Sequence, residues 1–396
     1  MTAPARSSSV ETPPSSTSSA AIPRLVAKVQ LGTPAQDFLV HLDTGSAVFW
    51  VRSADCASAA QCRKTSQAAF NKTLSSTFAP LGNQTTNTIT YADGTTVGCV
   101  TSQDTLSIGG IALRNRPFCL ADTIVSKTAL HDGIIGLAPP SVVEETNVFS
   151  ALTSAAGFKA QQVGFWYNTS DIVDGQIQSG AISFGGPDPL YYSGDVSWLQ
   201  ATIATGNHWG LPVNNLTLAD GTDLITAPTI AIVDSGSTFN YLPPALFNRI
   251  NLAQFFNSTN FDGAGTYVMN CSLVDKLTTF TIRLSGVEFK IPPEQQYFKF
   301  RDYCVITFTT SSTSTLPPIL GIQFLKSHYT VFDYKRFSIG FAGPPSAGTA
   351  LGSGGSSGSQ GNGTSSKNTA PRVGASLAVA AASALVALLA AAPLLM

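Results

Sequence analysis

Charged side chains are scarce in this chain, and neither sign dominates. Lys, Arg, Asp and Glu make up 11% of the 396 residues, with 22 basic side chains against 23 acidic ones. This balance lacks the basic excess of nucleic-acid-binding proteins, so we expect no nucleic-acid partner. Long helical periodicities are also rare, whereas Gly (34), Pro (23), Ser and Thr are frequent. We therefore expect short strands and turns in an all-β fold.

Histidine and cysteine are few, and their spacing indicates whether the chain binds metal and in which cellular compartment it folds. The four histidines are scattered, and no pair of the six cysteines has metal-ligand spacing, so we expect no metal and no cofactor. An even number of cysteines indicates structural disulfides in an oxidising compartment, with the pairing left open by the sequence alone. Glycosylation sequons agree with that compartment. They begin at Asn71, Asn83, Asn168, Asn215, Asn257, Asn270 and Asn362.

Large apolar side chains are nearly missing from residues 1–21, which are mostly Ser, Thr, Pro and Ala. Such a segment cannot offset the entropy lost on ordering, so we expect it to be disordered. No apolar segment follows Met1. Residues 1–21 are therefore not expected to be a signal peptide.

Charge is absent from residues 373–396, and the preceding residues 343–372 are rich in Gly and Ser. We expect 343–372 to be a flexible stalk. A transmembrane anchor usually leaves basic residues on the cytosolic side, and none follows residue 373. Small residues, a polar spacer and an apolar end instead indicate a glycosylphosphatidylinositol (GPI) attachment signal, with cleavage near Asn362-Gly363. A tail anchor is the alternative.

What the chain does contain is a repeated acidic turn. Phe38–Val51 leads from an apolar stretch through Asp43–Ser46 (Asp-Thr-Gly-Ser) into a second apolar stretch. Ile230–Phe239 repeats the plan through Asp234–Ser237 (Asp-Ser-Gly-Ser). Two aliphatic residues and a glycine follow each acid at a similar distance, as Ile134-Ile135-Gly136 and Ile319-Leu320-Gly321. Two half-chains therefore repeat one plan.

The repeated acidic turns resemble those of the pepsin-like aspartic proteases, a bilobal family with one catalytic aspartate in each lobe. The similarity runs from about Ile22 to Phe341 and includes three further stretches. Ile89–Gly94 resembles the flap hairpin, Ser179–Trp198 the passage between the lobes, and Pro318–Ala342 the closing strands of the second lobe. The resemblance implies two pseudo-symmetric β lobes around a central cleft, over residues 22–190 and 191–342.

The N-terminus departs from this family, whose members usually begin with a secretory signal and a basic pro-segment that blocks the cleft. Only Arg6 precedes Arg24 and Lys28 here. Either the given sequence starts late or the protein has lost self-inhibition. We expect the first, because the cysteines and sequons presuppose secretion.

The resemblance implies that Asp43 and Asp234 are the catalytic pair. Two carboxyl groups a few ångströms apart cannot both ionise cheaply, so they share one proton at acid pH. The pair then activates a water that attacks the substrate carbonyl. The neighbouring residues are implied to support the acids, through close-approaching glycines, serines that bind the outer carboxylate oxygens, and hydroxyls that reach the opposite loop. They are Thr44, Gly45, Ser46, Ser235, Gly236, Ser237 and Thr238.

Tyr91 occupies the position of the family's flap tyrosine, and Trp50 matches the residue that bonds it. Together they favour a hairpin that closes over substrate and excludes water, although a strand tyrosine alone is ordinary packing. Asp93 is either a specificity acid facing a basic substrate side chain, as in yapsin-like enzymes, or a solvated acid at the hairpin tip.

His41 stands where the family usually has an aliphatic residue. Strand alternation puts it on the same side as Asp43. A cationic imidazole there would favour the charged form of the acid pair and lower the pH at which activity begins. The alternative is a hydrogen-bonded histidine turned away from the cleft.

The resemblance also implies two of the disulfides. Cys56 pairs with Cys62 in a short loop and Cys271 with Cys304 in the second lobe, which leaves Cys99 with Cys119.

Two functional hypotheses remain. The first is a monomeric acid endopeptidase that binds extended polypeptides by strand-like pairing and is held at the cell surface by a GPI anchor, similar to fungal yapsin-type enzymes. Secretion without the anchor is also open. The second is a non-catalytic surface binding protein or adhesin with the same fold. Both acidic turns are intact, which favours the enzyme.

Overall fold

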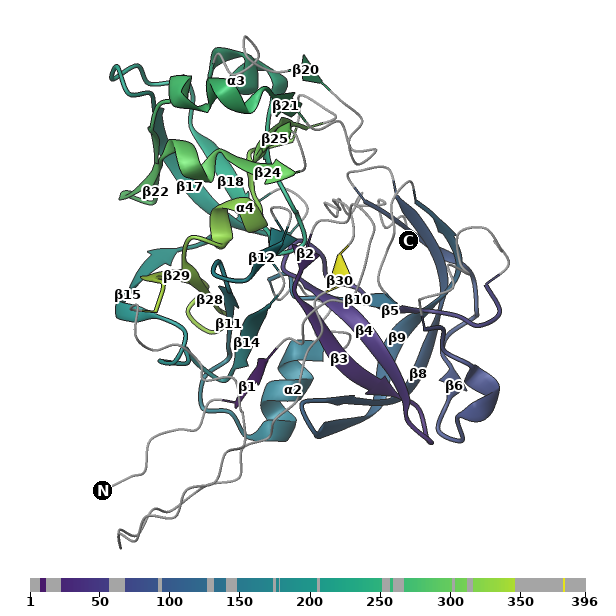
Figure 1. Cartoon of the computed structure of the whole chain (residues 1–396). Coiled ribbons are helices and arrows are strands. Elements are labelled where there is room, and N and C mark those ends of the chain that lie inside the picture. The colour runs from purple at the N-terminus through teal and green to yellow at the C-terminus, as the bar shows by residue number, and fades with distance from the viewer. Residues whose placement is uncertain are drawn as a thin grey trace, which may run out of the picture.

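Strands dominate the computed structural model of the chain, as the sequence predicts (Figure 1). The structure describes residues 8–11, 23–56, 68–91, 95–126, 132–139, 148–173, 176–177, 179–204, 207–250, 257–258, 267–300, 303–311, 316–345 and 380–381. Within these residues the helices are short. They are α2 (Val148–Ala156), α3 (Pro244–Arg249) and α4 (Ile322–Leu325), with 3-10 turns at Lys72–Leu74, Cys271–Lys276 and Pro293–Gln295. None of the described helices is long and apolar enough to cross a membrane.

The first half of the chain forms a sheet that curls back on itself. Its strands are, in spatial order, β3 (Val26–Leu31), β4 (Gln36–Asp43), β10 (Gly133–Gly136), β5 (Phe49–Arg52), β9 (Ile111–Val125), β8 (Thr96–Ile108) and β6 (Ala79–Pro80), with β7 (Asn87–Thr90) also paired to β8. The sheet closes toward a barrel because β3 pairs with β8 as well as with β4. Buried and more exposed residues alternate along β8, as expected of a strand with one face on the core.

The second half builds a similar sheet of its own. In spatial order its strands are β23 (Val287–Ile291), β22 (Phe280–Leu284), β17 (His208–Thr217), β18 (Thr229–Val233), β27 (Ile319–Leu320), β19 (Asn240–Leu242) and β26 (Phe308–Thr310), with β16 (Thr202–Ala204) paired to β17. A smaller sheet lies in the same half. It contains β20 (Asn257–Ser258), β21 (Tyr267–Met269), β25 (Tyr303–Ile306) and β24 (Tyr297–Phe300). The two halves thus form the two lobes visible in Figure 1.

A third sheet joins the lobes. Its order is β1 (Ser8–Glu11), β14 (Gly180–Phe184), β11 (Gln162–Tyr167), β28 (Tyr329–Asp333), β29 (Ser338–Gly343) and β15 (Ser193–Gln200). Here β28, close to the end of the described chain, pairs with β11 from the first half. Strands from both sides of residue 190 therefore share one sheet, and the division into 22–190 and 191–342 stays a prediction.

The N-terminal segment 1–21 contributes one strand, whereas the sequence analysis expects disorder throughout. β1 pairs antiparallel with β14 at the edge of the joining sheet. Backbone pairing accounts for this strand, and composition alone does not reveal such pairing. Two short pairs complete the fold, β12 (Ile172–Val173) with β13 (Gln176–Ile177) and β2 (Pro23–Arg24) with β30 (Ala380–Ala381). The rest of the predicted stalk and apolar tail, from residue 346 on, lies outside the described residues.

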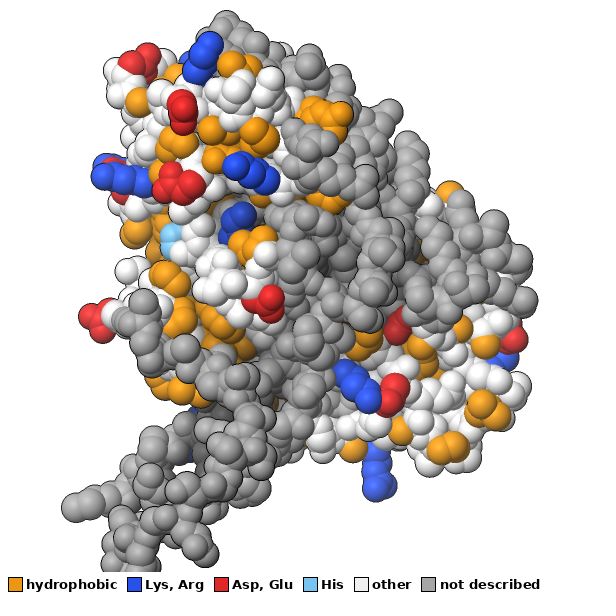
Figure 2. Space-filling view, in the orientation of Figure 1, with side chains coloured by type: hydrophobic (Ala, Val, Ile, Leu, Met, Phe, Trp, Pro, Cys, Tyr) orange, Lys and Arg blue, Asp and Glu red, His pale blue; other side chains and the backbone are white. Residues whose placement is uncertain are grey.

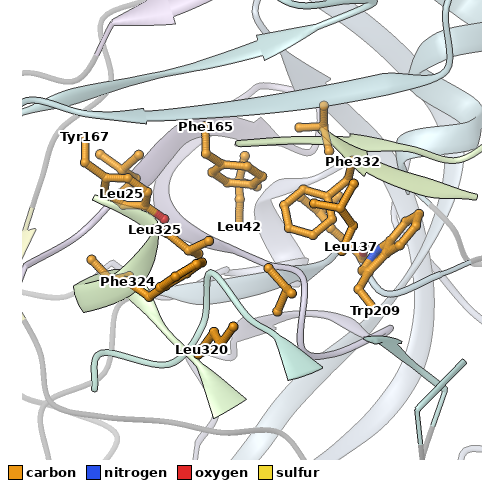
Figure 3. Packing of buried hydrophobic residues seen from close by; sticks show 14 of the residues in the cluster. Leu25, Leu42, Leu137, Phe165, Tyr167, Trp209, Leu320, Phe324, Leu325 and Phe332 are labelled. Atoms are coloured by element: carbon orange, nitrogen blue, oxygen red, sulfur yellow. Dashed lines mark hydrogen bonds between the residues drawn. The ribbon is translucent and has the colours of Figure 1, made fainter. Parts of the chain in front are cut away.

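One apolar core extends across both lobes and the joining sheet. Figure 3 shows Leu42, which precedes the first acid, and Leu320, which lies beside the second, in this same core. The rings of Phe165 and Phe332 pack edge to face at 5.8 Å, and Trp209 lies 5.4 Å from Phe332. Because the interior is continuous, the two acidic turns are fixed relative to each other.

Candidate active site

Both acidic turns are built by the same crossing of strands. β4 delivers Asp43 to its turn, and β10 lies parallel to β4 with Gly136 opposite Asp43. β18 likewise delivers Asp234, and β27 lies parallel to it. In each lobe the inserted strand also pairs antiparallel with the strand that leaves the turn, β5 or β19. The repeated sequence plan thus folds into a repeated structure.

Glycine is required where each inserted strand passes beneath its turn. A Cβ on Gly136 would lie 2.5 Å from the Ser46 carbonyl oxygen, and one on Gly321 would lie 2.5 Å from that of Ser237. Backbone atoms cannot move aside as a flexible side chain can. The Ile-Ile-Gly and Ile-Leu-Gly segments are therefore packing braces for the acids.

The two carboxyl groups meet at the interface of the lobes. The side chains of Asp43 and Asp234 are buried, and a Cβ on Gly236 would lie within 2.9 Å of an oxygen atom of each. Each acid also lies against the glycine of the opposite turn. A Cβ on Gly45 would lie 2.5 Å from Asp234 Oδ1, and one on Gly236 would overlap Asp43 Oδ1. Residues far apart in the sequence therefore share one site.

Matching hydrogen bonds orient the two carboxyl groups. The Gly45 N–H donates to Asp43 Oδ1 at 2.8 Å, and the Ser46 hydroxyl donates to Oδ2 at 2.5 Å. In the second turn the Gly236 N–H and the Ser237 hydroxyl donate to Asp234 at 2.7 and 2.6 Å. Each carboxyl group thus accepts a fixed donor on both of its oxygens, which sets its orientation.

Thr44 and Ser235 connect the two turns by exchanging hydrogen bonds. The Thr44 hydroxyl accepts from Ser235 N at 2.9 Å and donates to the Val233 carbonyl at 3.1 Å. The Ser235 hydroxyl accepts from Thr44 N at 3.0 Å and donates to the Leu42 carbonyl at 2.8 Å. Both side chains are buried, so these bonds are shielded from water. Thr238, the remaining predicted support residue, is buried at the end of the second turn.

We expect Ser235→Ala to destabilise the folded protein. The change leaves the Thr44 N–H and the Leu42 carbonyl without this buried partner, which costs about 2 kcal/mol or more in unfolding free energy. Denaturant unfolding measures the loss. Ser235→Thr, which keeps the hydroxyl, is the control and should stay near the wild type; equal stability of Ala and Thr variants would contradict the assignment.

The environment of Asp43 favours a protonated carboxyl group. Burial, and next the negative charge of Asp234, raise the pKa of Asp43 well above its ordinary value. The donors at Gly45 and Ser46 act in the opposite direction but do not reverse the shift. Two buried carboxyl groups this close together cannot both ionise cheaply.

Comparison with known proteins shows the family of the chain. The family model "Eukaryotic aspartyl protease" matches residues 25–343. The chain belongs to this family. It is similar to pepsin A of Bos taurus, with 31% identity over 79% of this chain and 82% of that protein. Gastricsin of Homo sapiens is 29% identical over 80% of both chains, and pregnancy-associated glycoprotein 2 of Bos taurus is 30% identical over 80% and 81%.

Membership of the eukaryotic aspartyl protease family implies hydrolysis of peptide bonds, and the pepsin-like, bilobal all-β fold is confirmed.

In this aspartyl protease the predicted flap residues lie together. The Trp50 indole N–H donates to the Tyr91 hydroxyl at 2.7 Å, and Tyr91 N bonds the Thr95 carbonyl at 2.8 Å across the base of the hairpin. Tyr91 is 2% exposed, so the ring is packed rather than solvated. Asp93 lies outside the described residues.

His41 is buried beside the second acidic turn. Its Nε2 lies 3.1 Å from the Ser235 carbonyl oxygen, so this nitrogen carries the proton. The imidazole thus lies close to the acid pair, as the first hypothesis for His41 expects. It is also hydrogen-bonded to the backbone, as the second expects. Its effect on the pH of activity stays a prediction.

His208, at the start of β17, is a site residue that the sequence analysis missed. It is 2% exposed and close to Asp234 and to the Gly45 backbone. Burial lowers the pKa of His208, and the Asp234 charge and the Gly45 backbone offset this only in part. No signal in the sequence marks it, because a lone histidine before a tryptophan has no motif around it.

The described cysteines are all in disulfides. Cys99–Cys119 and Cys271–Cys304 are formed as the sequence analysis expects. Cys56 is also disulfide-bonded, while its expected partner Cys62 lies outside the described residues. No group of three or more potential metal ligands occurs among the residues that the structure describes.

Proposed function

We propose that this protein is an aspartic endopeptidase in which Asp43 and Asp234 activate a water molecule between them. The observation that carries the proposal is the contact of the two carboxyl groups, each backed by the glycine of the opposite turn. Burying two acids side by side costs stability. Proteins keep such groups mainly at functional sites, so the pair supports a catalytic role.

The chemistry follows from one shared proton. The ionised carboxyl takes a proton from the water as the water oxygen attacks the peptide carbonyl carbon, and the protonated carboxyl donates to the carbonyl oxygen. The tetrahedral intermediate then collapses: its C–N bond breaks, and the amine nitrogen receives a proton from the pair. No bond forms between substrate and enzyme. Gly45, Ser46, Gly236 and Ser237 keep the carboxyl groups oriented throughout.

Extended polypeptides are the proposed substrates. The Tyr91 hairpin would cover the bound chain, with Trp50 holding the Tyr91 hydroxyl in place. Basic and acidic side chains are interspersed on the face shown in Figure 2, without a large basic patch among the described residues, which suits a peptide better than nucleic acid. A role for Asp93 in selecting basic side chains, as in yapsin-type enzymes, belongs to this proposal.

We further propose a GPI-anchored monomer at the cell surface, with secretion or a tail anchor as alternatives. The disulfides and sequons support passage through an oxidising compartment. Two of the sequon asparagines, Asn83 and Asn270, are exposed and thus accessible to glycosylation. The anchor signal rests on the composition of residues 343–396 alone.

Digestion of denatured globin at two pH values tests the enzymatic proposal. Because the pKa of Asp43 is raised, the shared proton stays bound to a higher pH than the proton of an ordinary aspartic acid, and it is lost as the pH rises through the raised pKa. We therefore expect rapid cleavage at about pH 4 and at least roughly tenfold slower cleavage at about pH 7.5. Asp43→Asn is the control for contaminating proteases. No cleavage at either pH would favour a non-catalytic binding protein.

A further inference from the structure

His208 lies in a short segment of the second lobe that is fixed against the first lobe. On its two sides, Asn207 Nδ2 donates to the Pro139 carbonyl at 3.1 Å and Trp209 Nε1 donates to the Leu137 carbonyl at 2.9 Å. Leu137 in turn donates its N–H to the Asp43 carbonyl at 2.6 Å. The backbone around His208 is therefore tied to the first acidic turn.

The His208 ring is not fully bonded in this structure. Neither ring nitrogen has a hydrogen-bond partner of good geometry among the described residues, although the Gly45 backbone lies close enough to favour the charged form. A buried, unbonded imidazole costs stability, so its presence needs a reason. Hydrogen bonds at active sites are often poorly aligned without substrate and tighten in the complex.

His41 makes the corresponding contact from the first lobe to the second. It comes from the first lobe and bonds the Ser235 carbonyl of the second acidic turn. His208 comes from the second lobe, between two residues that are bonded to Pro139 and Leu137 of the first lobe, and it lies near the Gly45 backbone of the first acidic turn. Each lobe thus directs one imidazole to the backbone of the opposite turn, beside the exchange between Thr44 and Ser235.

We propose that His41 and His208 are positioning residues that form a second clamp between the acidic turns, with His208 completing its bond to the Gly45 carbonyl when substrate is bound. Gly45 also donates to Asp43 and packs against Asp234, so a shift of its backbone moves both carboxyl groups. The clamp therefore controls the alignment of the acids and not substrate affinity. This inference rests on the proposed peptidase activity.

Paired substitutions of His208 test the clamp. His208→Leu removes the N–H donor and should lower kcat by about 10²-fold through misalignment of the acids, with KM changed less than about twofold. His208→Gln keeps an N–H donor, so its kcat should be roughly tenfold higher than that of His208→Leu. The double variant with His41→Leu should lose less than the product of the two single losses.

His328→Leu is the matched control. His328 is half-buried, and its ring packs among Phe289, Phe324 and Phe341. It should change stability without changing kcat. Wild-type kcat in His208→Leu, or an equal fall in kcat for the Leu and Gln variants with a raised KM, would overturn the clamp. If His208→Leu does not fold, His208→Ala, which also lacks the N–H donor, replaces it.

A measurement without turnover separates the clamp from the catalytic proposal. Ring-nitrogen NMR of His208 in Asp43→Asn should show a newly hydrogen-bonded N–H when a peptide substrate is added. An unchanged His208 signal in the peptide-saturated protein would overturn the clamp. Full peptidase activity of Asp43→Asn would instead overturn the catalytic proposal, and the NMR signal would still report on the clamp.

Discussion

Replacing Asp43 with asparagine is expected to lower kcat/KM by about 10⁴-fold, because the one remaining carboxyl group cannot supply both the acid and the base. The amide has nearly the volume of the carboxyl group, and its oxygen can still accept from the Gly45 N–H. The fold should therefore persist. Asp234→Asn should have the same effect, since the hydrogen bonds of the two turns match.

Asp333→Asn is the appropriate control for the chemical change itself. Asp333 is also buried and accepts hydrogen bonds from Gln162 and from backbone N–H groups, but it lies on β28 in the joining sheet. Its replacement should lower the unfolding free energy and leave kcat near that of the wild type. If Asp43→Asn retained more than a tenth of wild-type kcat/KM, the proposed mechanism would be wrong.

Gly236→Ala should abolish most activity without touching either acid. The new Cβ would overlap Asp43 Oδ1 and lie 2.7 Å from Asp43 Cγ and 2.9 Å from Asp234 Oδ1. The Asp43 carboxyl group has to move, and it is confined by Ser46 and Gly45. A displacement on the order of 1 Å at reacting groups costs about 10²-fold in rate.

The control for this substitution is Gly343→Ala. A Cβ there meets nothing nearer than Ser193 Oγ at 3.4 Å, and Gly343 ends β29 far from the acidic turns. Measuring kcat and thermal unfolding for both variants separates misaligned acids from general destabilisation. Equal activities of the two alanine variants would show that the acids do not need the glycine.

The sequence predicted the acidic turns and their internal bonds because those contacts are local. Gly45 and Ser46 reach Asp43 from two and three residues away, and any chain with this turn can form the same bonds. The pairing of Asp43 with Asp234 was predictable only through the repeat and the family resemblance. No periodicity in either strand specifies which distant strand it meets.

His208 and the joining sheet escaped prediction for a different reason. Their role depends on which segments the tertiary fold brings together, such as β28 beside β11. The alternation of β28 is hidden because all five residues are buried, so its pattern fits any interior strand. β1 was missed because backbone pairing with β14, and not composition, orders it.

The exchange between Thr44 and Ser235 also explains why the two turns need not be identical. Both hydroxyls use one donor and one acceptor, and the bonds go to backbone groups. The methyl group of threonine makes none of these bonds. Serine at 235 therefore preserves the connection between the lobes.

The late position of β28 and β29 has a consequence for biosynthesis. These strands occupy the middle of the sheet that unites the lobes, yet they are among the last described parts of the chain to be translated. A ribosome-bound nascent chain that ends before them has both acids but no finished scaffold around them. We therefore expect a nascent chain to gain peptidase activity only after both strands have been made.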